Sequence, residues 1–391
     1  MNIQTAKTLR QANNEFYKAN AESFSATRHA PWNGWRTFAE MLRESLKLEE
    51  ELKERARSCK SEGADGGASF DGAAREAVAG NEVGEGDGLG VEELHGTSSS
   101  AHAPKGAATN DSARDAAPTL AESKPPSHSM DCAAGLSLFK QFSVADLACG
   151  NMRFEQFLGE ALPAYLMECH AFDNCNALAL SAAAQGIPGV SVMYRSLDAI
   201  GVLLDAWAAE AAANFAEDQA SDLGLRSAAG EASFLADLRE QAVAPLAGAL
   251  ARRMNVPGCD CAVSFGFMHH VPTQALRAAV LDALVSQVRP GGLVAVSFWR
   301  FMEHEALAAK AHETTAAGLK YLGLNPESVD EGDHLLGWKE TEGPYRYCHS
   351  FTSEEIDCLV FAVAGKAKLV ARYMADGRSE DLNEYVVLQV R

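Results

Sequence analysis

Residues 144–158, with the sequence VADLACGNMRFEQFL, combine side chains and spacing suited to binding a small polar ligand. An apolar run leads into Gly150, and the residues that follow have the pattern of a helix. A glycine lets the backbone approach a ligand closely, and the first turn of a helix presents free N–H groups. The pattern predicts a strand, a tight turn and a helix that bind the polar end of a nucleotide-like cofactor. A turn that only connects two elements is the alternative.

Three acids around this turn favour a nucleoside-binding site. Asp146 lies in the turn, and Asp173 and Asp198 follow the next two predicted strands. A carboxylate after the second strand is placed to accept both ribose hydroxyls, and one after the third could accept the exocyclic amine of adenine. The dinucleotide fingerprint G-x-G-x-x-G does not fit, because the long cation Arg153 stands where its last small residue should be.

Strand-like and helical segments alternate around these acids. The predicted strands cover residues 142–148, 166–173, 190–196, 260–266, 293–299, 367–374 and 384–390. Helical patterns lie between the strands at 174–184, 273–288 and 303–322. This alternation predicts an α/β fold, with a mostly parallel sheet and helices on both faces. The last two strands are joined by the short turn 376–381, so they should form an antiparallel hairpin.

The strand-end acids and the seven-strand order resemble the class I S-adenosylmethionine-dependent methyltransferases. The resemblance covers about residues 139–391 and implies a Rossmann-like seven-stranded sheet, S-adenosyl-L-methionine as the cofactor, and methyl transfer as the activity. Position 152 departs from the family pattern, since Met152 stands where the family usually has glycine. We expect its side chain to crowd the methionine end of the cofactor.

Three further stretches are similar to the tRNA wobble-uridine carboxymethyl methyltransferases, which include domains fused to AlkB-like dioxygenases. Residues 16–32, FYKANAESFSATRHAPW, are similar to the family's N-terminal Y-x(6)-F-S-x-T-R-x-x-P-W segment. VSFGFMHH at 263–270 and VRPGG at 288–292 are similar to its fourth strand and the R-P-G-G turn. DHLLGWK and YRYCHSF, within 333–351, are similar to its D-x-L-x-x-W and R-Y-x-H-x-F region.

This resemblance implies a set of site residues. Arg28, Arg346 and His349 are candidates for binding a substrate anion, because the planar guanidinium of arginine can donate to both oxygens of a carboxylate. His269 is the fourth catalytic candidate. The candidate cofactor-binding residues lie in the N-terminal segment and at the strand ends: Tyr17, Trp32, Asp146, Ala148, Gly150, Asn151, Asp173, Asn174, Asp198, Phe265 and Gly266.

His269 and His270 follow one another at the end of the fourth predicted strand, where ligands bind in open α/β sheets. Neighbours on a strand point to opposite faces, so at most one of them should face the pocket, and we favour His269 over a purely structural role. Cys259 and Cys261 lack a second Cys or His pair, so no metal site is predicted.

Composition divides the chain into three segments. Residues 1–57 favour helices around an aromatic, proline-containing stretch, which makes them a candidate helical cap or lid. Residues 58–131 contain so few large apolar side chains that burial cannot offset the entropy of ordering, and they are predicted to be a disordered, low-complexity linker. Residues 139–391 form the predicted methyltransferase domain, with an Ala-rich helical insertion at about 200–257.

The net charge of −19 argues against a protein that coats nucleic acid non-specifically, since such binding needs clustered Lys and Arg. Nine scattered cysteines favour a reducing compartment, and no apolar segment is long enough for a signal peptide or a membrane span. We therefore expect a cytoplasmic protein that contacts no membrane.

Three functions are open at this stage. The first is O-methylation of the carboxymethyl group of a tRNA wobble uridine, for which the family's eukaryotic members imply a small activating protein partner. The second is methylation of a small carboxylic acid or another metabolite, which the acidity of the chain favours. The third is a non-catalytic cofactor-binding or interaction protein, suggested by Met152 and the long insertions. A carboxylate acceptor is already ionised at neutral pH, so it would need positioning and exclusion of water but no general base.

Overall fold

The computed structural model describes residues 1–26, 30–64, 140–183, 186–221, 231–256, 258–337 and 343–391. The chain divides into two units, one of Met1–Arg55 with Cys132–Arg391 and one of Ala56–Asp131. Most of the predicted linker, from residue 65 onwards, lies outside the described residues. The sheet, the site and all contacts discussed below belong to the first unit.

Two helices precede the sheet: α1 (Ile3–Ser25) and α2 (Asn33–Ala64). The sheet contains β1 (Lys140–Leu147), β2 (Tyr165–Asp173), β3 (Val190–Ser196), β4 (Cys259–Ser264), β5 (Val288–Trp299), β8 (Ala367–Ala375) and β9 (Asn383–Val390). The helices that follow β1 are α4 (Arg153–Ala161), α5 (Asn176–Ala183), α6 (Ala199–Ser221), α7 (Glu231–Met254), α8 (Gln274–Ser286), α9 (Glu305–Leu322) and α10 (Ser353–Ala362). A two-stranded sheet of β6 (Asp333–Leu336) and β7 (Arg346–His349) lies outside the main one.

The strand order of the main sheet is β3-β2-β1-β4-β5-β9-β8. The first five strands in this order are parallel, whereas β9 is antiparallel to both β5 and β8. The predicted fold class is confirmed: an α/β, Rossmann-like, seven-stranded sheet that is mostly parallel, with an antiparallel last hairpin and helices on both faces.

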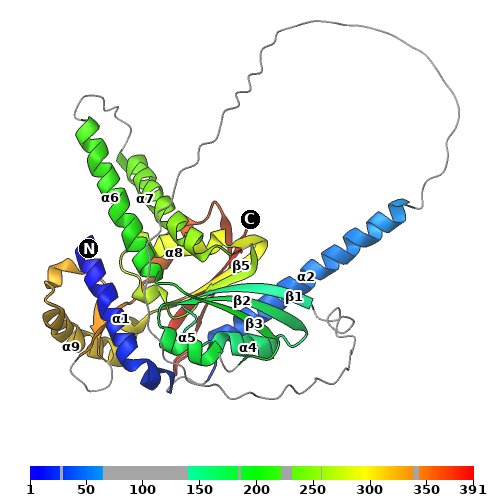
Figure 1. Cartoon of the computed structure of the whole chain (residues 1–391), viewed down its shortest axis with the longest axis horizontal. Coiled ribbons are helices and arrows are strands. Elements are labelled where there is room, and N and C mark those ends of the chain that lie inside the picture. Colours follow the sequence, from blue (N-terminus) through cyan, green and yellow to red (C-terminus); the bar gives the residue numbers. More distant parts are fainter. Residues whose placement is uncertain (27–29, 65–139, 184–185, 222–230, 257, 338–342) are drawn as a thin grey trace, which may run out of the picture. The chain divides into compact units, whose positions relative to one another are not determined.

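Helices lie on both faces of the sheet (Figure 1). Alternating residues of the strands pack against the helices of opposite faces. On one face, Ala145 and Leu147 of β1 pack in a core that includes side chains from α6, α7, α8 and α10. On the other face, Phe142 and Val144 pack with aromatic and aliphatic side chains of α2 and α4. The two-residue repeat of β-strands therefore produces both helical layers, as predicted.

The structure also contains elements that the sequence patterns did not indicate. The pair β6–β7 carries two stretches that were noted only for their resemblance to a family, and α10 is a short helix beside the sheet. The predicted insertion at about 200–257 forms the helices α6 and α7 between β3 and β4. Among the residues that the structure describes, no helix is both long and apolar enough to cross a membrane.

Candidate functional site

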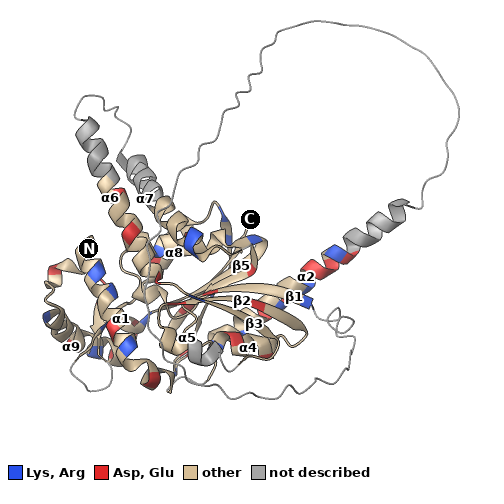
Figure 2. Ribbon diagram, viewed as in Figure 1, with Lys and Arg blue, Asp and Glu red and all other residues tan. Residues whose placement is uncertain are grey.

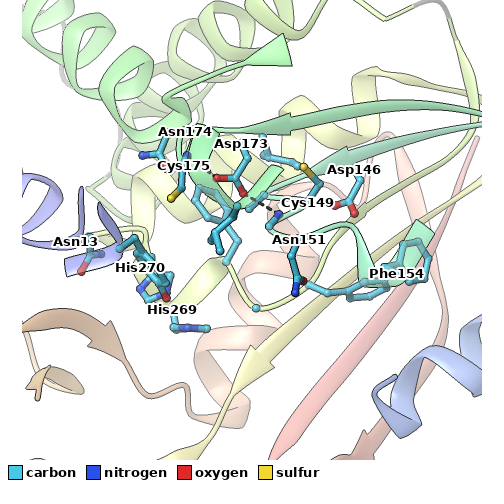
Figure 3. Close-up of a pocket in the computed structure, with 18 of the residues that line it drawn as sticks. Asn13, Asp146, Cys149, Asn151, Phe154, Asp173, Asn174, Cys175, His269 and His270 are labelled. Carbon is cyan, nitrogen blue, oxygen red and sulfur yellow. Dashed lines mark hydrogen bonds between the residues drawn. The ribbon is translucent and has the colours of Figure 1, made fainter. Parts of the chain in front are cut away.

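A cavity of about 380 Å³ lies at the carboxyl ends of β1, β2 and β4 and extends to the residues that follow β3. Its volume is in the range of small-molecule sites. Figure 3 shows Asp173, Asn174 and Cys175 along one side, the two histidines with Asn13 on a second, and Asn151 with Phe154 on a third. All eleven candidate cofactor-binding residues line this cavity: Tyr17, Trp32, Asp146, Ala148, Gly150, Asn151, Asp173, Asn174, Asp198, Phe265 and Gly266.

The glycine turn, residues 148–152, follows directly after β1. Ala148, Gly150 and Met152 all have left-handed backbones, with φ of +71°, +56° and +56°. The N–H groups of Ala148 and Cys149 donate to the carbonyl of Phe172 at 2.8 and 3.0 Å, which ties the turn to β2. A Cβ at Gly150 would have no other heavy atom within 4 Å, so the space beside this residue is open.

Met152 occupies the position where a glycine was expected from the family pattern. Its side chain is 1% exposed and packs with Cys149, Cys169, Ala171 and Ala179. It does not line the cavity. The expectation that Met152 crowds the methionine end of the cofactor is therefore wrong, because the left-handed backbone directs the thioether into a buried apolar cluster.

Asp173 connects the ends of β1 and β2. One carboxylate oxygen accepts the N–H of Gly150 at 2.9 Å, and the other accepts the N–H of Cys175 at 2.7 Å. Burial raises the pKa of Asp173, while these N–H donors oppose the rise by stabilising the anion. A carboxylate has about four acceptor sites, so this one keeps capacity for further donors such as ribose hydroxyls.

Asp146 lies beside the buried Glu155 of α4. Burial is the main cause that raises the pKa of Asp146 well above its usual range, and the charge of Glu155 adds to it. Burial likewise raises the pKa of Glu155 to about 7. Two carboxyl groups at this depth disfavour double ionisation, so Asp146 contributes less negative charge to the cavity than a count of acids suggests.

Asp198 is bound by Arg10 of helix α1, a contact that the sequence did not predict. Arg10 donates from Nε and Nη2 to Oδ2 of Asp198 at 2.8 and 2.5 Å. Oδ1 of the same carboxylate accepts the N–H of Gly201 at 2.7 Å. The acid predicted to bind the adenine amine thus lies in the cavity wall with both oxygens already engaged.

Both His269 and His270 line the cavity, so the prediction that at most one would do so is wrong. They belong to the 3₁₀ helix η1 (Met268–His270) that follows β4. Because this helix has about three residues per turn, adjacent side chains are not directed to opposite faces as they are on a strand. Their ring centroids are 4.1 Å apart, and Nε2 of His270 is 2.7 Å from the hydroxyl of Tyr17.

The ligand atoms of His269, His270 and Cys348 lie within 4.8 Å of one another, a spacing that a metal ion could use. However, Nδ1 of His270 is 2.9 Å from the carbonyl of Tyr347, and its Nε2 meets Tyr17. Both nitrogens of His270 therefore have protein partners, and we do not assign a metal site to this group.

Two of the predicted anion-binding residues, Arg346 and His349, differ in whether they line the cavity. Arg346 lines the cavity, where its guanidinium lies 5.4 Å from the ring centroid of Phe16 and 5.6 Å from that of Trp299. His349 does not line it, although the sequence placed it among the catalytic candidates. It is buried, with Nδ1 2.7 Å from Asp333 and Nε2 3.0 Å from Glu355. Arg28 lies outside the described residues.

The aromatic part of the N-terminal segment is fixed to the sheet. Trp32 stacks on Trp35 with ring centroids 5.2 Å apart, and a Cβ on Gly266 would lie 2.9 Å from the Trp32 ring. The N–H of Gly34 donates to Asp376 at 3.1 Å, beyond the end of β8. Trp32 and Trp35 thereby form one wall of the cavity.

Several cavity residues were not anticipated from the sequence. Asn13 and Asn14 carried no motif, and their signal was the spacing of polar residues along α1. Asp376 and Asn383 belong to the hairpin β8–β9, where the sequence indicated only a turn. Arg153, which argued against a dinucleotide site, lines the cavity with its guanidinium 5.4 Å from the centroid of Trp35.

No family of known sequences matches this chain, and no curated protein does. Its fold is similar to a methyltransferase described as S-adenosylmethionine-dependent from Methanosarcina mazei, at 12% identity and a TM-score of 0.40, over 67% of this chain and 98% of that one. An N-methyltransferase from Bradyrhizobium japonicum, solved with S-adenosyl-L-homocysteine, is 10% identical with a TM-score of 0.32, over 64% of this chain and 78% of its own. Magnesium protoporphyrin IX methyltransferase from Synechocystis is 10% identical with a TM-score of 0.33, over 66% and 78%. These likenesses concern the fold alone.

Proposed function

We propose that this chain is an S-adenosyl-L-methionine-dependent methyltransferase whose acceptor is a carboxylate, by resemblance the carboxymethyl group of a tRNA wobble uridine. The observation that carries the proposal is one cavity that contains both the strand-end acids and Arg346. The acids suit a nucleoside cofactor, and the arginine suits an anionic acceptor beside it.

The residues present fit this cofactor. The open space beside Gly150 suits the amino-acid portion of the cofactor. The carboxylate of Asp173 accepts the N–H of Gly150 and has acceptor sites left for the ribose hydroxyls. Asp198 lies at the adenine end by the same assignment, and Phe265 and Gly266 form the floor near Trp32. When bound, S-adenosylmethionine would supply the electrophilic methyl group.

The chain's own residues would bind and orient the acceptor. Arg346 is 8% exposed, and its guanidinium lies near the rings of Phe16 and Trp299, which restrict its movement. Such a planar donor can hold a carboxylate through two parallel hydrogen bonds. The acceptor oxygen needs no general base, and Trp32 with Trp35 would exclude water. By resemblance, we include Arg28 as a second donor to the carboxylate and residues 1–57 as the cap.

A small carboxylic acid is the second candidate acceptor. The described cavity lining contains four aspartates and two arginines, and α1 forms one of its walls. Figure 2 shows acidic and basic positions interspersed along α1 and α2. A cavity of about 380 Å³ next to surfaces of mixed charge favours a small acceptor, whereas tRNA would require a basic surface or the activating protein partner that the resemblance implies.

Cofactor binding and methyl transfer test the proposal separately. Calorimetry should show binding of S-adenosyl-L-homocysteine that Asp173→Ala weakens by about 1.5–3 kcal/mol, because a charged acceptor is lost. Unchanged affinity would remove Asp173 from the site, and no binding to the unaltered protein would refute the cofactor assignment.

The acceptor is tested by transfer of a radiolabelled methyl group to carboxymethyluridine-containing tRNA and to a panel of small carboxylic acids. Arg28→Ala and Arg346→Ala should lower transfer far more than cofactor affinity, and lysine should restore little because it lacks the planar fork. Full activity in both alanine variants would exclude the arginines as carboxylate donors. Transfer to a small acid and none to tRNA would establish the second acceptor.

A further inference from the structure

Helix α1 presents one polar face to the cavity. Arg10, Asn13, Asn14 and Tyr17 have the i, i+3, i+4, i+7 spacing that places residues on one side of a helix. These residues contact Asp198, the N–H of Tyr347, Asn174 and His270 at 2.5–2.8 Å. Asn14 also donates from Nδ2 to Oδ2 of Asp198, at 3.4 Å. The helix therefore connects the ends of β2, β3 and β4 to β7.

The contact of Arg10 with Asp198 is closely packed. A Cβ on Gly201 would lie 2.9 Å from Nη2 of Arg10 and 3.0 Å from the carboxyl carbon of Asp198. Glycine at position 201 thus leaves the room in which the two side chains meet. The hydrogen bond to Asp198 is the main cause that raises the pKa of Arg10, so the guanidinium remains charged.

These contacts leave a defined part of the carboxylate free to accept. The two Arg10 donors occupy Oδ2, and the N–H of Gly201 takes one of the acceptor sites on Oδ1. Since a carboxylate has about four such sites, one site on Oδ1 remains. An ionised carboxylate can only accept, so this site suits an amine and disfavours a carbonyl oxygen.

We infer that Arg10 is a positioning residue for base recognition: it orients Asp198 so that the remaining acceptor site selects the amino group of adenine over the carbonyl group of hypoxanthine. This inference rests on the proposed function, because it assumes that the nucleoside of the cofactor lies at Asp198. Arg10 itself does not line the cavity and acts only through the carboxylate.

The experiment compares S-adenosylhomocysteine with S-inosylhomocysteine, which carries a carbonyl in place of the amine. Dissociation constants are measured by calorimetry for the unaltered full-length chain, Arg10→Ala, Arg10→Lys and Arg43→Ala. Arg43 is the matched control, since it joins α2 to the carbonyl of Ala161 at 2.8 Å and does not line the cavity.

We expect Arg10→Ala to weaken S-adenosylhomocysteine about tenfold and to leave S-inosylhomocysteine within about twofold, so that the preference for adenine falls about tenfold. Arg10→Lys should restore part of the preference, and Arg43→Ala should retain all of it. In an Asp198→Asn background, Arg10→Ala should have no further effect on the preference.

An equal loss of affinity for both ligands in Arg10→Ala would show that Arg10 only holds α1 in place, and the inference would be wrong. An unchanged preference would overturn it as well. If the unaltered chain bound neither ligand, the proposed function would fail and the inference with it. If that chain bound both ligands equally, the cofactor assignment would survive and the inference alone would fail.

Discussion

Glu155→Gln should stabilise the protein at neutral and alkaline pH. Glu155 is fully buried on α4, where its carboxyl group lies beside Asp146 and 3.7 Å from the thiol of Cys169. Burial raises its pKa from 4.5 to about 7. The native state therefore retains a proton that the unfolded chain releases, and the glutamine variant removes this titration while keeping the shape of the side chain.

The direction in which stability changes with pH follows from proton linkage. Between about pH 4.5 and about pH 7 the folded protein binds more protons at Glu155 than the unfolded chain does, so the free energy of unfolding falls as pH rises through this window. A shift of one pKa unit corresponds to about 1.4 kcal/mol, and this shift corresponds to about 3 kcal/mol. The stabilisation from the proton retained at Glu155 is complete below about pH 4.5 and absent above about pH 7.

Urea denaturation of the unaltered protein, Glu155→Gln and Glu160→Gln between pH 4 and pH 9 measures this difference. Glu160 is an exposed residue of the same helix and serves as the control. The stability of Glu155→Gln relative to the unaltered protein should rise by about 2–3 kcal/mol across the window, whereas Glu160→Gln should give a parallel profile. Parallel profiles for Glu155→Gln and the unaltered protein would refute the argument that Glu155 retains a proton.

Two further substitutions test how the site is supported. Met152→Gly should destabilise the protein by about 1–3 kcal/mol in urea denaturation, because loss of a buried side chain outweighs about 1 kcal/mol of relief at its positive φ. A gain in stability would show that the backbone relief is the larger effect. Asp376→Ala should cost about 2–4 kcal/mol, since its carboxylate accepts from Gly34, Asn383 and Tyr385 and all three donors would lose their acceptor. Unchanged stability would show that water replaces that carboxylate.

Local patterns were sufficient to predict the main sheet. The predicted strand at 190–196 coincides with β3, and the antiparallel hairpin followed from a connection too short for a parallel crossover. The glycine turn and its acids were also predicted, because a strand, a turn and a helix that are contiguous in sequence define their own geometry. The candidate cofactor residues of the turn and the strand ends line one cavity, together with Tyr17 and Trp32, which were proposed from the resemblance of the N-terminal segment.

Contacts between distant segments could not be predicted in this way. Arg10 and Asp198 are 188 positions apart, and the periodicity of α1 shows which residues share a face but not what that face contacts. The two histidines were expected to alternate as neighbours on a strand do, because they follow the fourth predicted strand at 260–266. In the structure β4 ends at Ser264, and Gly266 has a φ of +72° before η1 begins.

Contacts within the glycine turn and contacts between distant segments together determine the charge of the cavity. Four aspartates line it, yet Asp198 is paired with Arg10, Asp376 is buried among three donors, and the ionisation of Asp146 is disfavoured by burial and by Glu155. Asp173 remains as the aspartate whose charge is stabilised by backbone N–H groups alone. A cavity with this reduced negative charge, and with Arg346 in its wall, can hold a cationic cofactor next to an anionic acceptor. The acidity of the whole chain is therefore no argument against a carboxylate substrate.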